Sequence, residues 1–318
     1  MMKRVVLYGL MGIIFIVQSS VFVEAGGKDK VGAATALFLN IAQGARPAGM
    51  GGAFVACVDD VNACWWNPAG LIRINSREIL YANTRWIEGV DGNFIAYAQP
   101  TTAYEGKKRI IAGSVVLSND SGIDGRDGQD KSIGSLKVEN RAIVFSTALG
   151  LTPATSIGAS LKAISQDLGG SKGESMAVDL GWLFSPGENL SFGMNLQNIG
   201  PKLKTEDASN DLPLNLKLGF CFKPAILGDN VKAAVDVDVP RNNDVGVHGG
   251  IEYWTSNLMC IRVGYERASE NRSGYSIGMG FKGSGEGIMK AINTQIDYAM
   301  LSYADFDPTH RVSLITRF

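Results

Sequence analysis

The sequence has little charge, few cysteines and only two histidines, and each shortage excludes a class of function. Charged residues make up 19% of the 318 residues and nearly cancel, with a formal net charge of −1. No basic face or run stands out, so we do not expect nucleic acid as a partner. His248 and His310 are not at ligand spacing from any of the four cysteines, so we expect no metal site. Four cysteines are also too few for a disulfide scaffold.

Long hydrophobic runs are missing as well. The run at the amino terminus covers thirteen residues, Val5 to Val17, whereas a membrane-spanning helix needs roughly 20. Lys3 and Arg4 precede it and Val23-Glu24-Ala25 follows it, which is the pattern of a secretory signal peptide cleaved after Ala25. We therefore predict that residues 1–25 are a signal peptide and that no helix spans a membrane.

Motifs of enzymes and cofactor-binding proteins are not found either. The glycines around Met50 do not fit dinucleotide spacing, and no Gly-Lys-Ser/Thr ending marks a phosphate loop. His248 shares a face of a predicted strand with Glu252, but no local motif places a serine or cysteine nucleophile. Asp59 and Asp60 are adjacent carboxylates, for which a structural role is commoner than catalysis. We expect no catalytic residue, no cofactor and no metal.

The sequence does contain a persistent alternation of apolar and polar residues from Glu78 to its end. A period of two is typical of strands with one face in an apolar medium and the other in a polar one. Two architectures fit: a soluble sandwich with the apolar face in its core, and a membrane barrel with that face toward lipid. In the clearest segment, Leu214, Leu216, Leu218, Phe220 and Phe222 alternate with Asn215, Lys217, Gly219, Cys221 and Lys223.

The number and length of the strands favour the barrel. Most predicted strands have about nine to twelve residues, the length that a tilted strand needs to cross a bilayer, whereas soluble proteins average about 5–6. We therefore predict an all-β fold, a transmembrane antiparallel β-barrel of about 14 strands. The predicted segments are 78–86, 92–99, 108–118, 136–149, 155–166, 175–185, 190–199, 214–223, 230–239, 245–254, 258–269, 274–282, 289–301 and 309–318.

The connections alternate in length as in outer-membrane barrels, with short periplasmic turns and longer outer loops. The short turns are Leu151–Ala154, Pro186–Asn189, Ala225–Asp229 and Thr255–Asn257; the longer connections are Asn119–Ser135, Asp167–Glu174, Gly200–Pro213 and Ser302–Pro308. Arg241–Asp244 and Pro100–Lys107 depart from the rule. The longer connection Asn119–Ser135 has four aspartates without calcium-loop spacing, so we predict that it is a solvated surface loop. They are Asp120, Asp124, Asp127 and Asp130.

The inward face of the predicted barrel carries charges of both signs. We expect these side chains to pair across strands, to support a segment in the lumen or to line a water path. They are Lys217, Lys223, Lys232, Asp236, Asp238, Glu252, Arg262, Glu266, Lys282, Asp297, Arg311 and Arg317.

One stretch, Gly44–Leu71, does not follow the strand pattern. It reads GARPAGMGGAFVACVDDVNACWWNPAGL. The glycines around Met50 tolerate positive φ and let another backbone come close. In NPAGL the residue before proline is pushed out of the α region, proline fixes its own φ, and the glycine permits a left-handed conformation, which predicts a stiff turn. Asp59 or Asp60 can cap Val61–Cys64 as a single helical turn.

The combination of GARPAGMGGAF, the Asp-rich step and WNPAGL resembles the amino-terminal signature of the PorV/PorQ outer-membrane family. That family itself resembles the FadL-type fatty-acid transporters. The resemblance implies a fourteen-stranded barrel whose lumen holds this stretch as a plug, with residues 26–75 as the plug and residues 76–318 as the barrel. The plug and turn residues are Gly44, Arg46, Pro47, Gly49, Met50, Gly51, Gly52, Phe54, Asp59, Asp60, Trp66, Asn67, Pro68, Ala69, Gly70 and Leu71.

The cysteines of this stretch leave two alternatives. Cys57 and Cys64 are close enough in the sequence to pair in an exported protein. The alternative is two buried thiols. Trp65, Trp66 and Phe54 give the predicted plug an apolar surface that a hydrophobic solute must pass.

The last strand, HRVSLITRF, ends on Phe318. A carboxyl-terminal phenylalanine in such a strand resembles the signal that the barrel assembly machinery reads. With the signal peptide, this predicts a bacterial outer-membrane protein whose partners are outer-membrane lipid and the assembly machinery.

Three functions remain open. The resemblance to FadL-type proteins implies a transporter that passes hydrophobic small molecules when the plug shifts. The resemblance to PorV implies instead a scaffold that works with components of the type IX secretion system on exported proteins. The predicted outer loops are short by FadL standards, which keeps the scaffold in consideration. The third and weakest alternative is a soluble periplasmic β protein with a binding role.

Overall fold

The structure, a computed structural model, describes residues 34–103, 106–126, 128–205, 209–224, 230–255, 258–267, 273–283, 293–303 and 306–318. The predicted signal peptide lies outside these residues, and its cleavage stays a prediction. The predicted turn at Ala225–Asp229, Asp127, and residues 256–257, 268–269, 289–292 and 304–305 of other predicted segments also lie outside them. Within the described residues, no helix is both long and apolar enough to cross a membrane.

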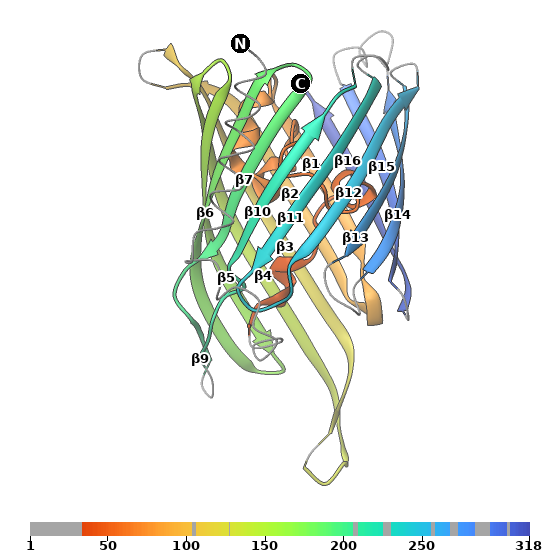
Figure 1. The fold of residues 1–318 in the computed structure, drawn as a ribbon. Coiled ribbons are helices and arrows are strands. Elements are labelled where there is room, and N and C mark those ends of the chain that lie inside the picture. Colours follow the sequence, from red (N-terminus) through yellow and green to blue (C-terminus); the bar gives the residue numbers. More distant parts are fainter. Residues whose placement is uncertain are drawn as a thin grey trace.

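In the described part of the chain, sixteen strands form one antiparallel sheet, which the pairing of β5 with β6 closes into a barrel (Figure 1). Two strands, β8 (Leu203–Lys204) and β9 (Ser209–Asn210), have two residues each, so fourteen long strands make the wall. This confirms the predicted fold. The wall consists of β1 (Glu78–Arg85), β2 (Asp91–Thr102), β3 (Lys108–Arg126), β4 (Ser132–Thr152), β5 (Thr155–Leu168), β6 (Ser171–Gly187), β7 (Leu190–Ile199), β10 (Asn215–Phe222), β11 (Val231–Pro240), β12 (Gly246–Thr255), β13 (Met259–Arg267), β14 (Ser273–Gly283), β15 (Asn293–Tyr303) and β16 (Phe306–Arg317).

Side chains alternate between the lumen and the outer surface as the sequence predicts. On β12, Val247 and Ile251 are 45% and 55% exposed, whereas His248 and Glu252 are buried. On β16, Val312 and Leu314 are exposed, whereas Ser313 between them is buried. Successive side chains of a strand point to opposite faces, so on these two strands the apolar set is on the outside of the barrel and the polar set faces inward.

One predicted outer loop is largely strand. We expected a loop at Asn119–Ser135, but β3 continues to Arg126 and β4 begins at Ser132, and the two remain paired up to Arg126↔Ser132. The resulting hairpin stands out beyond the rest of the wall (Figure 1). The prediction failed because backbone pairing continues here without apolar alternation, which only a strand with one lipid-facing side requires.

Two other connections are shorter than predicted. Between β5 and β6, the expected loop Asp167–Glu174 reduces to a turn at Gly169 and Gly170, whose φ values are +63° and +106°. Glycine is the residue that adopts such values without steric cost, so this pair closes the hairpin tightly. At the other end of the barrel, β2 runs through Pro100 to Thr102, which shortens the connection predicted at Pro100–Lys107.

The lumen has two chemically different halves. The inward side chains of β1 to β5 include many apolar ones, which belong to the main hydrophobic core. The inward side chains of β10 to β16 include most of the buried charges. The apolar set is Leu80, Ala82, Phe94, Ala96, Ala98, Ile110, Ala112, Val116, Ala142, Val144, Ala148 and Ile164; the buried charged set is Asp236, His248, Glu252, Arg262, Asp297 and Arg311.

Candidate functional site: the segment inside the barrel

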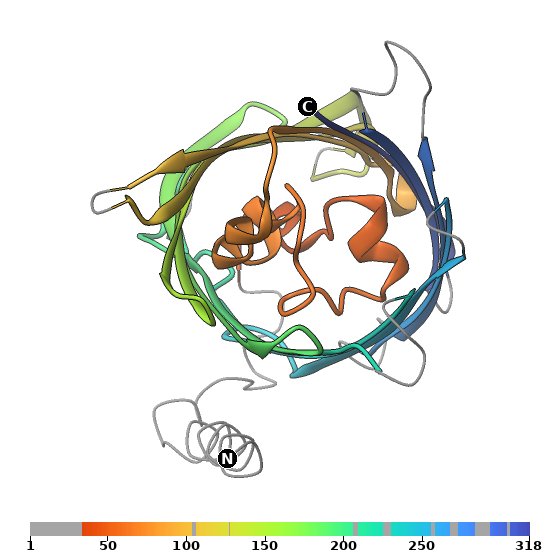
Figure 2. The same cartoon turned by 90° about the horizontal axis from the view of Figure 1, so that it is seen from above.

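Residues 34–75, here called the lumen segment, lie inside the barrel and cross its opening when viewed along the axis (Figure 2). The segment consists of short helical turns and loops, and it is the region that we predicted to be a plug. Most of its side chains between Gln43 and Leu71 are buried, because they meet the wall on all sides. The turns are η2 (Leu37–Asn40), α2 (Ala45–Gly49), α3 (Ala63–Trp66) and η3 (Pro68–Arg73).

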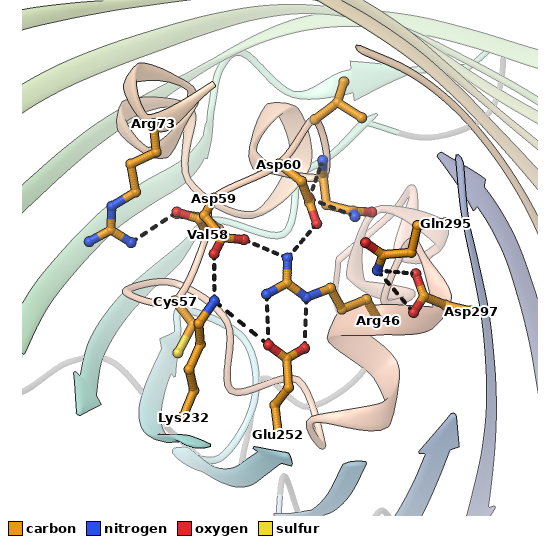
Figure 3. A network of polar contacts seen from close by, with 12 residues as sticks. Arg46, Cys57, Val58, Asp59, Asp60, Arg73, Lys232, Glu252, Gln295 and Asp297 are labelled. Atoms are coloured by element: carbon orange, nitrogen blue, oxygen red, sulfur yellow. Dashed lines mark hydrogen bonds and ion pairs between the residues drawn. The ribbon is translucent and has the colours of Figure 1, made fainter. Parts of the chain in front are cut away.

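Arg46, on α2, is the centre of a buried ionic network (Figure 3). Its Nε and Nη2 donate to the two carboxylate oxygens of Glu252 on β12, each at 2.9 Å. Its Nη1 donates to Asp59 at 2.5 Å and to Asp60 at 2.7 Å. The guanidinium also lies over the ring of Phe54, 5.2 Å from its centroid. This fork geometry is the one in which arginine binds carboxylates best.

The network continues along the barrel wall through two further cations. Arg262, on β13, donates to Glu252 at 2.8 Å and to Asp297 at 2.7 Å. Lys232, on β11, lies 2.5 Å from Asp59 and 3.7 Å from Glu252. Four of the predicted inward charges, Lys232, Glu252, Arg262 and Asp297, therefore pair across strands or with the lumen segment. A buried charge is tolerated only with such partners, so the network fixes the position of the segment.

The network also sets the protonation of its members in the lumen segment. For Asp59, burial raises the pKa, but the charges of Arg46 and Lys232 outweigh it and hold the pKa well below its usual range. For Arg46, burial lowers the pKa, but Asp59, Glu252 and Asp60 together raise it well above its ordinary value. Asp59 is therefore ionised and Arg46 protonated across the physiological range of pH.

Backbone groups of the segment bind polar side chains on the same half of the wall. Asp236, on β11, accepts hydrogen bonds from the amides of Phe54 at 2.6 Å and Val55 at 2.7 Å. Nδ1 of His248 lies 2.8 Å from the carbonyl oxygen of Gly51 and must donate to it, because a carbonyl only accepts. These contacts satisfy backbone groups that have no helix or sheet partner.

Gly51 and Gly52 have the positive φ values that the sequence allowed, +63° and +80°, whereas Gly49 does not. A Cβ on Gly51 would lie 2.6 Å from the backbone nitrogen of Tyr265 on β13. A Cβ on Gly49 would lie 3.2 Å from Cα of Gly278 on β14. The glycines thus allow the segment to touch the backbone of the wall, as predicted.

The NPAGL stretch forms the predicted stiff turn, with one difference. Asn67 is extended, with φ −164°, and its side-chain oxygen accepts from the amide of Ala69 at the start of η3. Its side-chain nitrogen donates to the carbonyls of Val55 and Trp182. Gly70 does not have the positive φ that we expected. A Cβ there would collide with the side chain of Val58, so glycine is needed for space and not for conformation.

The expected cap of a helical turn by Asp59 or Asp60 is not formed. The helical turn α3 begins at Ala63, and no side chain caps it. Asp60 instead accepts from the backbone and side-chain nitrogens of Asn62, at 2.9 and 2.8 Å, while Asp59 binds Arg46 and Lys232. The ionic network holds both aspartates, because buried carboxylates gain more from cations than from one helical turn.

The structure corrects both alternatives for Cys57, which neither pairs with Cys64 nor stays a free thiol, and it bears out the buried thiol for Cys64. Cys57 forms a disulfide with Cys221 on β10, with the Cα atoms 5.4 Å apart, so the segment is covalently attached to the wall. Cys64 is a buried free thiol in the apolar core, and burial raises its pKa to about 12. Cys57 is bonded to β10, whereas Cys64 belongs to α3, which contacts β3 and β4. Their short separation in the sequence could not reveal this difference.

Cavities lie on both sides of the lumen segment. A cavity of about 620 Å³ on the side of the β4–β5 and β6–β7 turns is lined by Cys57, Asp59, Arg73 and Lys232. A neighbouring cavity of about 470 Å³ shares Arg73 with it. At the outer end, a cavity of about 100 Å³ is lined by aromatic and charged side chains of segment and wall, among them Trp65, Trp66, Trp86, Lys217, His248 and Tyr303. The segment therefore separates an inner from an outer space.

Several wall residues that bind the segment were not predicted. Each of them has a polar side chain at an inward position of a strand. The sequence cannot say which of the many inward polar side chains meet the segment. They include Glu78, which accepts from the amide of Val61; Ser156, which donates to the carbonyl of Ala69; Asn195 and Gln197, which donate to the carbonyls of Trp66 and Trp65; and Ser313, which accepts from the amide of Ala45.

The remaining predicted residues are also placed. Pro47 and Met50 are buried with α2, and Trp66 donates its ring N–H to the carbonyl of Gln43. Phe318 is 52% exposed and its backbone pairs with Arg77. Its role as an assembly signal stays a prediction. Among the described residues, no group of three metal-ligating side chains comes together.

Comparison with known proteins gives the fold but not a family. No family model matches the chain, and no curated protein matches its sequence. Among solved structures, the chain is similar to the CymD monoaromatic hydrocarbon channel, with 13% identity, a TM-score of 0.63 and coverage of 86% of this chain and 97% of that one. It is similar to the Pseudomonas putida toluene transporter TodX, with 12% identity, a TM-score of 0.62 and coverage of 87% and 98%.

A third similar structure is a FadL homologue from Pseudomonas aeruginosa, with 11% identity, a TM-score of 0.55 and coverage of 85% and 96%. At sequence identities this low, the similarity shows a shared fold and not a shared function. The predicted resemblance to PorV and PorQ stays a prediction. The chain has the fold of the FadL-like barrels.

Proposed function

We propose that this protein is a bacterial outer-membrane channel for small hydrophobic molecules and that the lumen segment is its movable plug. The observation that carries the proposal is the division of the lumen. Polar and covalent bonds hold the segment mainly to β7, β10–β12 and β16, while mostly apolar contacts join it to β1–β4. The similar structures named as hydrocarbon and toluene carriers support the same class of solute.

The apolar side of the segment is the side that a hydrophobic solute can use. The ring of Trp65 lies 6.2 Å from that of Phe94 on β2, and Cys64 packs in the same core. A solute that moves between these surfaces replaces one apolar contact by another. On the opposite side it would have to separate the buried Arg46–Glu252 pair and break its two charge-assisted hydrogen bonds.

The anchored side determines how the plug can move. Cys57 is bonded to Cys221, so the middle of the segment cannot leave the wall at β10. The apolar contacts have no fixed hydrogen-bond geometry and can slide or open by small steps. A shift of α3 away from β3 and β4, with the disulfide side as the fixed point, is the movement that we propose for opening.

A cross-link between α3 and the wall tests this movement. α3 contacts β3 and β4, and Val116 and Val144 are inward residues of these strands. In the variants Val116→Cys and Val144→Cys, Cys64 has a new partner for a disulfide. The control is Ile143→Cys, which faces outward.

Cells that lack the chromosomal gene and carry one variant each are assayed for uptake of radiolabelled toluene. Variants that form the cross-link should lose uptake, and a reducing agent should restore it, while Ile143→Cys should behave as wild type throughout. Wild-type uptake in the cross-linked protein would contradict the proposed movement. Unchanged uptake after deletion of the gene would contradict the channel itself.

The scaffold for secreted proteins remains a second candidate, and the β3–β4 hairpin favours it. The hairpin projects beyond the wall, where it can meet another protein (Figure 1). The test is surface display of secreted proteins in the same deletion strain. Loss of display with normal toluene uptake would favour the scaffold, and replacement of residues 120–137 by a short turn should then reproduce that loss.

A further inference from the structure

Arg311, on β16, is a fully buried cation that has no hydrogen bond and no ion pair in the described part of the chain. Its exposure is 0%, and Nε, Nη1 and Nη2 are all without a partner. The other two buried arginines of the network are paired, Arg46 with Glu252 and Arg262 with Asp297. A guanidinium has five N–H donors and no acceptor, so its burial requires acceptors that the described residues do not supply.

The surroundings of Arg311 contain a second unpaired donor and an aromatic wall. Thr309 precedes it by two residues on the same face of β16, is 1% exposed, and has a hydroxyl without a partner. The guanidinium carbon lies 5.1 Å from the ring centroid of Trp86. A cation–π contact stabilises the charge over one face of the guanidinium but leaves the N–H groups at its edge unsatisfied.

We propose that Arg311, Thr309 and Trp86 form a binding site for a small anion with a single negative charge, a halide or a short carboxylate. The guanidinium edge and the threonine hydroxyl donate hydrogen bonds to the anion, and the indole ring shields the cation. Charge-assisted hydrogen bonds of this kind are about twice as strong as neutral ones.

The nearest opening is the outer cavity of about 100 Å³, which is lined by Trp86 and Tyr303. Arg311 is fully buried behind Trp86, so an anion must pass these rings to reach it. Next along the inward face, Ser313 accepts a hydrogen bond of 2.7 Å from the amide of Ala45 in α2. Anion binding here does not depend on transport.

Iodide quenching of tryptophan fluorescence tests the site in the purified protein in detergent. Trp86 touches the guanidinium, so iodide bound at Arg311 should quench it at low concentration and saturate, at ionic strength held constant with gluconate. Chloride and formate should compete with iodide, and the more effective competitor identifies the preferred class of anion. Quenching that only rises linearly with iodide, as collisions produce, would overturn the proposal.

Variants localise the effect. Arg311→Gln should abolish the saturable quenching, and Arg141→Gln, at an exposed position of β4, should not change it. Thr309→Val keeps the shape of the side chain and should weaken iodide binding roughly tenfold, which corresponds to one lost hydrogen bond to a charge. If Arg311→Gln does not fold, Thr309→Val alone decides, and unchanged affinity in that variant contradicts the site.

Crystals soaked in bromide give a test without mutation. The anomalous signal should show one ordered bromide within hydrogen-bond distance of the Arg311 guanidinium and of the Thr309 hydroxyl. Ordered water alone at this position would show that solvent satisfies the guanidinium and would refute the anion site.

Discussion

Arg46 and Glu252 are 206 residues apart in the sequence and are joined by two hydrogen bonds of 2.9 Å inside the barrel. One residue belongs to the lumen segment and the other to the wall, so the pair connects the two parts of the molecule. Removal of one member breaks both of these bonds, although Arg46 keeps Asp59 and Asp60, and Glu252 keeps Arg262. The pair is therefore the best single position at which to separate the stability of the plug from that of the barrel.

Glu252→Gln should loosen the lumen segment near β12, with the Cys57–Cys221 disulfide intact, while the barrel persists. Loss of one partner of a buried pair destabilises by about 3–5 kcal/mol, and the strand ladder does not use this side chain. Chymotrypsin, which has sites at Phe54 and Trp65, should cut the segment of the variant at least tenfold faster than that of the wild type. The control is Glu139→Gln, because Glu139 is half exposed on the outer hairpin. If the segment of Glu252→Gln resists chymotrypsin like the control, the network does not hold the plug.

Gly51→Ala should displace the lumen segment, whereas Gly89→Ala should not. Both glycines have positive φ, +63° and +78°, so both variants carry a similar conformational cost of about 1 kcal/mol. Only at Gly51 does the added Cβ meet the wall, 2.6 Å from the nitrogen of Tyr265; at Gly89 nothing lies within 4 Å. Thermal unfolding and chymotrypsin sensitivity compare the two. Equal effects would mean that close approach to the wall is unimportant.

Cys64 should resist thiol reagents in the folded protein even after the disulfide is reduced. It is fully buried, and burial raises its pKa to about 12, so the reactive thiolate is scarce at pH 8 and increases only as the pH approaches that value. Cys57 and Cys221 line the inner cavity and should react from the periplasmic side once reduced. Mass spectrometry after treatment with a membrane-impermeant maleimide locates the label.

Two outcomes of that labelling would count against the structure. Modification of Cys64 before unfolding would show that α3 does not pack on the wall as described. Labelling of Cys57 from outside in intact cells, as readily as an engineered cysteine in the β3–β4 hairpin, would show that the segment is a surface element and not a plug.

Val235→Arg should impair folding in a bilayer far more than Val245→Arg. Both valines are 50% exposed, but Val235 is in the middle of β11 and Val245 is in the connection before β12. Arginine costs about 2–4 kcal/mol at the bilayer midplane and about 0–1 near the interface. The folded fraction is measured from the shift in gel mobility on boiling. Equal folded fractions would mean that the outer surface of β11 does not face lipid.

The sequence by itself determined the strands, their facing and the exceptional stretch at Gly44–Leu71. Alternation of side chains between two faces is a local property of an extended chain, so Val247 and Glu252 reveal their sides without knowledge of the fold. Glycine and proline act through the backbone of their own neighbourhood, so a close approach at Gly51 and a stiff turn at Asn67–Pro68 were also predictable.

Only the tertiary structure decided which inward residues meet the lumen segment. The disulfide of Cys57 with Cys221, the ion pair of Arg46 with Glu252 and the isolation of Arg311 depend on the register of every strand and on the closure of the barrel. The length of the β3–β4 hairpin was hidden for a related reason, since paired strands outside the membrane need no apolar alternation. Local patterns specify the face of a side chain, but contacts between distant residues exist only after the sheet has closed around the segment.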